Sequence, residues 1–181
     1  MNTTQTNRLS LPVLAATPAV QIVGFAILTA IAAQIRIPLP FTPVPITMQT
    51  LVVTLAGALI GWKKGALSQL LYVVWGAFGA PLFAGGAFGL AVLAGPTGGY
   101  LYGFIAGAML SGLLTPTKPS YLMAWGTQFI ASLPILFFGW LHLTLFVGND
   151  PANAFALGVA PFILGDLMKV TISAGLVKAL K

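Results

Sequence analysis

Long uncharged stretches, separated by one or two charged residues, run along most of this chain. Four of them, between Arg8 and Asp150, are 27, 26, 53 and 31 residues long. A helix that crosses the ~30 Å apolar core of a bilayer needs about 20 apolar residues. The 53-residue stretch therefore has room for two helices, and each of the others for one. With a last stretch near the C-terminus, the pattern predicts six membrane-spanning helices, over residues 18–36, 47–62, 66–80, 97–115, 120–146 and 158–178.

Two of the connections between these predicted helices are themselves apolar. Residues 38–45 contain four prolines in eight positions, which rules out a helix there. Residues 81–96 are apolar as well and rich in glycine. Irregular apolar backbone in a membrane protein folds against protein or lines a cavity. We therefore expect both loops to be lids or walls of a pocket.

The composition of the chain supports the same fold class. Hydrophobic residues occupy 58% of the 181 positions, charged residues 6%, and the mean hydropathy is +0.98. An ordinary soluble domain carries about 25% charged residues, so too few are present to cover a surface that faces water. The sequence predicts an all-α integral membrane protein, with residues 1–181 forming a single membrane domain.

Missing residue types exclude several kinds of chemistry. Because the chain has no cysteine, it has no disulfide, no thiolate metal site and no cysteine nucleophile. It also has no glutamate, hence no His-Glu-x-x-His metal site, and no Walker A sequence for ATP hydrolysis. The serines lack a Gly-x-Ser-x-Gly context, and His142 is the only histidine. We expect neither an enzyme nor a protein that holds a metal or cofactor.

The positive charges predict an orientation in the membrane. An even number of spans places both termini on one side, and that side collects six of the eight basic residues: Arg8, Lys63, Lys64, Lys118, Lys178 and Lys181. Basic residues are enriched in cytoplasmic loops, so we expect the N- and C-termini to be cytoplasmic and the apolar loops to face outward. The net charge of +6 then reflects contact with the lipid bilayer, without any nucleic acid.

Small residues recur at every fourth position in three of the predicted helices. This spacing lets helix backbones approach one another closely in lipid. We expect the glycines to pack inside the bundle, while for the two alanines contact with an external partner is also open. The positions are Gly95, Gly99, Gly103, Gly107 and Ser111; Gly57, Gly61 and Gly65; and Ala26 and Ala30.

Asp166 and Lys169 are the charged residues in the interior of a predicted span. Their i, i+3 spacing places them on one face of a helix, about one turn apart. Each costs at least ~2.5–3.5 kcal/mol at the bilayer centre, so such residues generally face the protein interior and serve a function. A carboxylate beside an ammonium suits a ligand that offers both donors and acceptors. A purely stabilising ion pair is the alternative.

Four blocks of sequence, in order, are similar to those of a known family. The segments Pro43–Leu51, Gly79–Gly86, Gly95–Phe104 and Pro161–Lys169 resemble the BioY family, the biotin-specific substrate-binding (S) components of energy-coupling factor (ECF) transporters. The resemblance covers nearly the whole chain from about Gly24. It implies a six-helix S component, multi-pass in the plasma membrane of a prokaryote, with an extracellular vitamin site. It also implies three partner subunits: a transmembrane coupling subunit and two cytoplasmic ATPases that use ATP.

The resemblance further implies roles for particular residues. In the family, the acidic and basic pair of the last helix contacts the ureido ring of biotin, which carries over to Asp166 and Lys169. The chemistry agrees, because the ureido group has two N–H donors and one carbonyl acceptor. Small residues of the first helix contact the coupling subunit in S components, which implicates Ala26 and Ala30.

The rest of the biotin molecule suggests further candidates. Its carboxylate is expected near the opening, with Arg36 or the backbone N–H groups of Gly85 and Gly86 as donors. The amide of Gln49 offers both a donor and an acceptor, and the proline-rich loop is stiff enough to close as a lid. Apolar walls for the thiophane ring and alkyl chain are expected from Phe41, Phe83, Phe88 and Tyr100.

Two other functions remain open at this point. One is an S component or self-sufficient carrier for another small vitamin, since the donor and acceptor pair is not unique to biotin chemistry. The other is a structural membrane scaffold, in which Asp166 and Lys169 only stabilise the bundle.

Overall fold

The computed structural model describes residues 16–181, so Arg8 lies outside the described part. The strands β1 and β2 are two residues each and pair antiparallel, with Arg36 opposite Thr47. In chain order the elements, with η denoting a 3-10 helix, are α2 (Pro18–Gln34), β1 (Arg36–Ile37), β2 (Ile46–Thr47), α3 (Gln49–Ile60), α4 (Trp62–Ala77), η1 (Ala84–Gly86), α5 (Leu90–Ala94), α6 (Gly98–Leu114), α7 (Tyr121–Thr144), α8 (Pro151–Gly158), η2 (Ala160–Phe162) and α9 (Ile163–Leu180).

Six of these helices (α2, α3, α4, α6, α7 and α9) overlap the six ranges that the sequence predicts. α3 has 12 residues and is therefore about 18 Å long, well short of the ~30 Å apolar core of a bilayer. Only Gly61 separates α3 from α4, and its φ of 84° lies in the left-handed region that favours glycine. A Cβ on Gly65 would lie 2.7 Å from the Cα of Gly57, so the two helices approach backbone to backbone.

The structure adds a helix that the sequence pattern does not indicate. α8 begins after Asp150, whose Oδ1 accepts hydrogen bonds from the backbone N–H groups of residues 152 and 153 at 2.9 and 3.2 Å. Pro151 occupies the first helical turn, where its missing N–H costs nothing. The predicted sixth span began at residue 158, whereas α9 begins at Ile163 because irregular backbone at Val159 and the turn η2 intervene.

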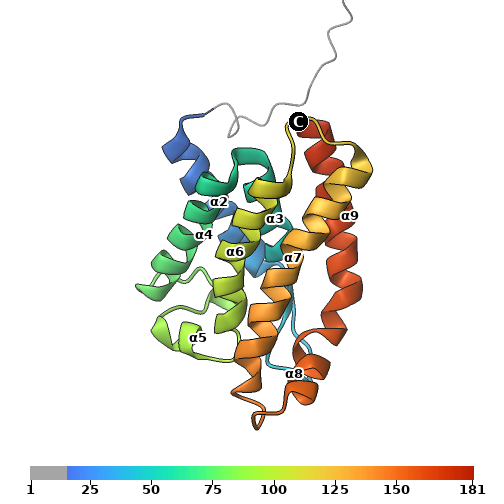
Figure 1. The fold of residues 1–181 in the computed structure, drawn as a ribbon. Helices are drawn as coiled ribbons and strands as arrows, with labels where there is room; N and C mark the ends of the chain where they lie inside the picture. The colour runs from blue at the N-terminus through green and yellow to red at the C-terminus, as the bar shows by residue number, and fades with distance from the viewer. Residues whose placement is uncertain (1–15) are drawn as a thin grey trace, which may run out of the picture.

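α3 and α6 form the centre of the bundle. α6 packs against α7, α3 and α4, and α3 also contacts α2 and α9. The described beginning of α2 and the C-terminal end of α9 lie at one end of the bundle, and α5 and α8 lie at the other (Figure 1). α5 lies within the glycine-rich loop 81–96, and the proline-rich loop 38–45 contacts α8, because the hydroxyl of Thr42 donates to the backbone oxygen of Leu157 at 2.9 Å.

The glycine stripe of α6 packs against α7, which confirms that it serves contacts within the bundle. A Cβ on Gly99 would lie 2.2 Å from the carbonyl oxygen of Phe138, and one on Gly103 would lie 2.7 Å from the Cα of Ile135. These distances are too short for any side chain. Glycine at these positions therefore allows the close packing of α6 against α7.

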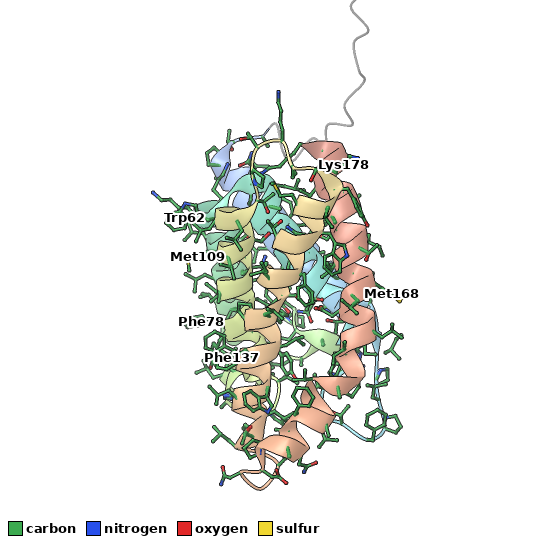
Figure 2. All side chains as sticks on the ribbon, turned by 45° about the vertical axis from the view of Figure 1, so that its right-hand side comes forward. Trp62, Phe78, Met109, Phe137, Met168 and Lys178 are labelled. Atoms are coloured by element: carbon green, nitrogen blue, oxygen red, sulfur yellow. The ribbon has the colours of Figure 1, made fainter. Side chains whose placement is uncertain are left out.

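The outer surface of the bundle is apolar. Figure 2 shows Trp62, Phe78, Met109, Phe137 and Met168 on the outside, and each is exposed. Among the described residues, α7 and the segment Pro151–Leu180 are long and apolar enough to cross a membrane by length and composition, and α2, α3 and α6 are apolar but shorter. Large apolar side chains on all sides match a lipid environment, because a soluble protein rarely exposes so many together.

Polar side chains in the core form hydrogen bonds with one another. Gln128 of α7 donates from Nε2 to Ser111 at 3.1 Å and to Thr115 at 3.3 Å, and its Oε1 accepts from Ser173 of α9 at 2.9 Å. Ser111 in turn donates to the backbone oxygen of Thr54 at 2.6 Å. This network connects α3, α6, α7 and α9 and fixes how α9 is rotated against its neighbours.

We predict that Gly57→Ala destabilises the protein, because a Cβ at this position would lie 1.9 Å from the carbonyl oxygen of Ala108. Overpacking of this kind costs about 1–3 kcal/mol, so the melting temperature in detergent is expected to fall. Gly126→Ala is the matched control, since a Cβ there would meet no atom within 4 Å. Equal melting temperatures for Gly57→Ala and the unchanged protein would contradict the close packing of α3 on α6.

Candidate functional site

A cavity of about 440 Å³ lies toward the end of the bundle that holds α5 and α8. Its volume falls in the range of roughly 300–1,000 Å³ that is usual for small-molecule sites. Its walls come from the proline-rich loop, α3, the glycine-rich loop, α6, α7, η2 and α9. Apolar side chains form most of the lining, including Val44, Phe83, Leu101, Phe104, Ile135 and Phe162.

Asp166 and Lys169 both line this cavity from the first two turns of α9. Their exposed fractions are 5% and 9%, so both ionisable groups are almost entirely shielded from solvent. The Nζ of Lys169 lies 3.9 Å from Oδ1 of Asp166 and donates a hydrogen bond to the backbone oxygen of Thr47 at 3.2 Å. The pair thus presents one acceptor group and one donor group to an otherwise apolar space.

Gln49, at the start of α3, also lines the cavity and is held by its neighbours. Its Nε2 donates to the hydroxyl of Tyr72 at 2.8 Å, and that hydroxyl donates to the backbone oxygen of Leu82 at 3.2 Å. The hydroxyl of Thr47 donates to Oε1 of Gln49 at 3.0 Å. These bonds connect the cavity wall to the glycine-rich loop.

Gln34 is a second anchor of the glycine-rich loop, and the sequence analysis did not single it out. Its Nε2 donates to the backbone oxygens of Leu82 and Phe83 at 3.3 and 3.2 Å, and its Oε1 accepts from the N–H of Gly86 at 3.1 Å. The signal in the sequence that could have indicated this role is a polar residue at the end of an apolar helix. Gln34 holds Phe83 at the cavity, where that side chain is 2% exposed.

Of the predicted apolar walls, the structure brings Phe83 and Tyr100 to the cavity. The hydroxyl of Tyr100 donates to the backbone oxygen of Gly158 at 2.6 Å, which ties α6 to the end of α8. Phe41 and Phe88 do not line the cavity and are 58% and 57% exposed. The loop backbone around them turns these two side chains outward, so the prediction that they form walls is not met.

Arg36 lines the cavity from β1, whereas Gly85 and Gly86 do not. The N–H of Gly86 already donates to Gln34, and a Cβ on Gly85 would lie 2.5 Å from Cζ of Arg36, so Gly85 leaves room for the guanidinium. Among the described residues, Asp166 and Lys169 form the only ion pair. The guanidinium of Arg36 therefore has no carboxylate partner within that part of the chain.

Ala26 and Ala30 lie inside the bundle. Their exposed fractions are 1% and 8%, and they belong to a core cluster with Val53 of α3 and with Tyr72 and Val73 of α4. The small side chains let α2 approach its neighbours within the chain. The structure therefore does not present either alanine to a partner subunit.

Within residues 16–181, no three His, Cys, Asp or Glu side chains are grouped so as to hold a metal ion. The polar groups that line the cavity, among them Asp166, Lys169 and Gln49, carry hydrogen-bond donors and acceptors. The cavity offers an acceptor and donor pair at one position, a guanidinium at another, and apolar walls elsewhere.

Comparison with known proteins places this geometry in context. A family model described as the BioY family matches residues 3–181. A protein of Pyrococcus horikoshii named a probable biotin transporter BioY is 43% identical over 145 residues, 80% of this chain and 84% of the relative. A biotin transporter BioY of Thermotoga maritima is 40% identical over 158 residues, 87% of this chain and 91% of the relative.

A solved structure shares the fold of this chain. It is a crystal structure at 2.1 Å of the S-component for biotin from an ECF-type ABC transporter, with a TM-score of 0.82 and 24% sequence identity. The match covers 90% of this chain and 89% of the other. The helical bundle described above is thus the fold of that S-component.

We predict that Gln34→Leu loosens the glycine-rich loop, because the N–H of Gly86 and the backbone oxygens of Leu82 and Phe83 each lose one hydrogen bond. Each lost hydrogen bond is worth about 1 kcal/mol, or roughly fivefold in an opening equilibrium, so amide hydrogen exchange over residues 82–86 is expected to rise by about fivefold or more. Hydrogen-exchange mass spectrometry measures this, with peptides of α7 as the internal control. Unchanged exchange over residues 82–86 would show that Gln34 does not hold the loop.

Proposed function

The chain belongs to the BioY family, and we propose that it is a biotin-binding membrane subunit that mediates biotin uptake. The observation that carries this proposal is the buried acceptor and donor pair, Asp166 and Lys169, in a cavity with mostly apolar walls. Ionisable side chains at such depth are costly unless they serve a function. Curated relatives that are 43% and 40% identical are named biotin transporters.

The ureido ring of biotin binds at this pair. The carboxylate of Asp166 accepts from a ureido N–H, and the ammonium of Lys169 donates to the ureido oxygen. Lys169 keeps this capacity because its ammonium has three N–H donors and one is used by Thr47. A charge-assisted hydrogen bond in a shielded cavity is stronger than the same bond in water. Gln49 lies beside this position as a further amide donor and acceptor.

The thiophane ring and the alkyl chain of biotin pack on the apolar part of the cavity. Phe83 and Tyr100 line it from the glycine-rich loop and α6, together with Phe104. The biotin carboxylate then lies near Arg36, whose guanidinium matches a carboxylate with two parallel hydrogen bonds. Gly85 supports this role by leaving the guanidinium room.

The direction of transport follows from the charges at the two ends of the bundle. Lys63, Lys64, Lys118, Lys178 and Lys181 lie at helix ends or connections away from the cavity. By the positive-inside rule that end is cytoplasmic, so in this proposal the six helices form one membrane bundle with both termini cytoplasmic and the cavity open to the outside. The proline-rich loop closes over the bound ligand.

Energy for uptake comes from partner subunits in this proposal. The chain contains no Walker A sequence, and the protein with the same fold is an S-component of an ECF-type ABC transporter. We place this chain with a transmembrane coupling subunit and two ATPase subunits in the plasma membrane of a prokaryote. The coupling subunit contacts surfaces other than Ala26 and Ala30, because both are buried.

We predict that Asp166→Asn lowers the affinity for biotin by about 10–100-fold, because a hydrogen bond to a charged group is worth about 1.5–3 kcal/mol. Isothermal titration of biotin into the purified protein measures the affinity. The matched control is Asp150→Asn, because Asp150 is the other acidic residue of the chain and caps α8 outside the cavity. Undiminished binding by a folded Asp166→Asn variant would refute the role of this carboxylate.

Arg36→Gln is expected to lower the affinity for biotin by about tenfold while leaving that for biotin methyl ester unchanged, because the ester has no carboxylate. Titration of both ligands into both proteins separates loss of a charge contact from a general disturbance of the loop. An equal loss for biotin and its ester would place the biotin carboxylate elsewhere.

A further inference from the structure

Thr50 carries an unsatisfied hydroxyl beside the cavity. In residues 16–181, its Oγ1 is the single buried side-chain oxygen or nitrogen without a hydrogen-bond partner. The residue sits in the first turn of α3 and lines the cavity. Buried polar atoms without a partner are rare in folded proteins, so each one calls for an explanation.

Helical threonines usually satisfy their hydroxyl through the backbone one turn earlier. Thr29 donates to the backbone oxygen of Phe25 at 2.8 Å, and Thr144 donates to that of Trp140 at 2.9 Å. Thr50 has no such bond. The carbonyl three residues before it, that of Thr47, accepts instead from the ammonium of Lys169.

The position of Thr50 follows from contacts on either side of it in the chain. Thr47 contacts Lys169 through its backbone oxygen, and Thr54 lies 3.4 Å from the hydroxyl of Ser173 of α9, measured between the two Oγ atoms. Thr50 precedes Thr54 by four residues in α3, so the two residues lie on the same face of that helix, toward α9. Thr50 and Lys169 both line the cavity.

We infer that the Thr50 hydroxyl donates a hydrogen bond to the ureido oxygen of the ligand, as a second donor next to Lys169. The inference rests on the proposed function and adds a residue that selects for a ureido carbonyl. A carbonyl oxygen has two lone pairs and accepts two donors. A threonine in a helix has two accessible χ1 rotamers, so its hydroxyl can change direction without backbone movement.

Thr50→Val tests this assignment, because valine keeps the shape of threonine and removes the hydroxyl. The melting temperature is expected to stay equal or rise, since no hydrogen bond within the protein is lost. The affinity for biotin is expected to fall by roughly tenfold, as for one buried hydrogen bond. Thr50→Ser keeps the hydroxyl and is expected to bind biotin within a few-fold of the unchanged protein.

A second ligand identifies the atom that the hydroxyl contacts. In 2-iminobiotin a cyclic guanidine replaces the ureido group, and in its protonated form at neutral pH an NH₂ group stands in place of the ureido oxygen, so a donor on the protein loses its acceptor. Titrations of biotin and 2-iminobiotin into the unchanged protein and Thr50→Val are expected to show a tenfold effect for biotin and little effect for the analogue. An equal loss for both ligands would overturn the contact with the ureido oxygen.

Thr54→Val is the matched control on the same face of α3. Thr54 is 2% exposed, does not line the cavity, and bonds Leu51 and Ser173. This variant is expected to melt at a lower temperature and to bind biotin within a few-fold of the unchanged protein. Biotin binding by Thr50→Val at the unchanged affinity would overturn the inference alone. Failure of the unchanged protein to bind biotin would overturn the proposed function and the role of Thr50 with it.

Discussion

The burial of one carboxylate and one ammonium among apolar helices is the constraint on which the rest of this structure depends. Asp166 and Lys169 are each less than a tenth exposed, and a charge at such a position needs partners. Lys169 finds them in Asp166 and in the backbone of Thr47, just before α3. The hydrogen bond from Lys169 to the backbone of Thr47 therefore fixes how the beginning of α3 and the first turns of α9 face each other, and this contact forms one wall of the cavity.

The remaining architecture holds these two helices in place. Gln128 and Ser173 fix the rotation of α9 one turn beyond Lys169, and glycine contacts bring α3, α4 and α6 together without intervening side chains. On the opposite wall, Gln34 and Tyr72 hold the glycine-rich loop through its backbone. Hydrogen bonds between neutral groups inside the bundle thus position the charged pair. The outer surface has no part in this, and its apolar side chains suit contact with lipid.

The sequence allowed the class of fold, the approximate helices and the charged pair to be predicted, because charges are rare in this chain and their positions carry information. The pattern of apolar residues does not predict which way a side chain points in an irregular loop. Phe41 and Phe83 were both expected at the cavity, but only Phe83 lines it. Gln34 and Thr50 are uncharged residues in apolar helices, and their importance depends on which atoms remain unpaired after packing. Ala26 is a further example. The spacing of small residues indicates close packing, but it does not distinguish packing against a helix of the same chain from packing against another subunit.

The central claim is that biotin binds with its ureido ring at the buried pair. A structure of the purified protein with biotin, at a resolution that locates the ring, tests it most directly. The account predicts a ureido nitrogen within hydrogen-bonding distance of the Asp166 carboxylate and the ureido oxygen within that distance of Nζ of Lys169. Biotin bound with its ureido ring away from both side chains, or outside the cavity, would contradict it.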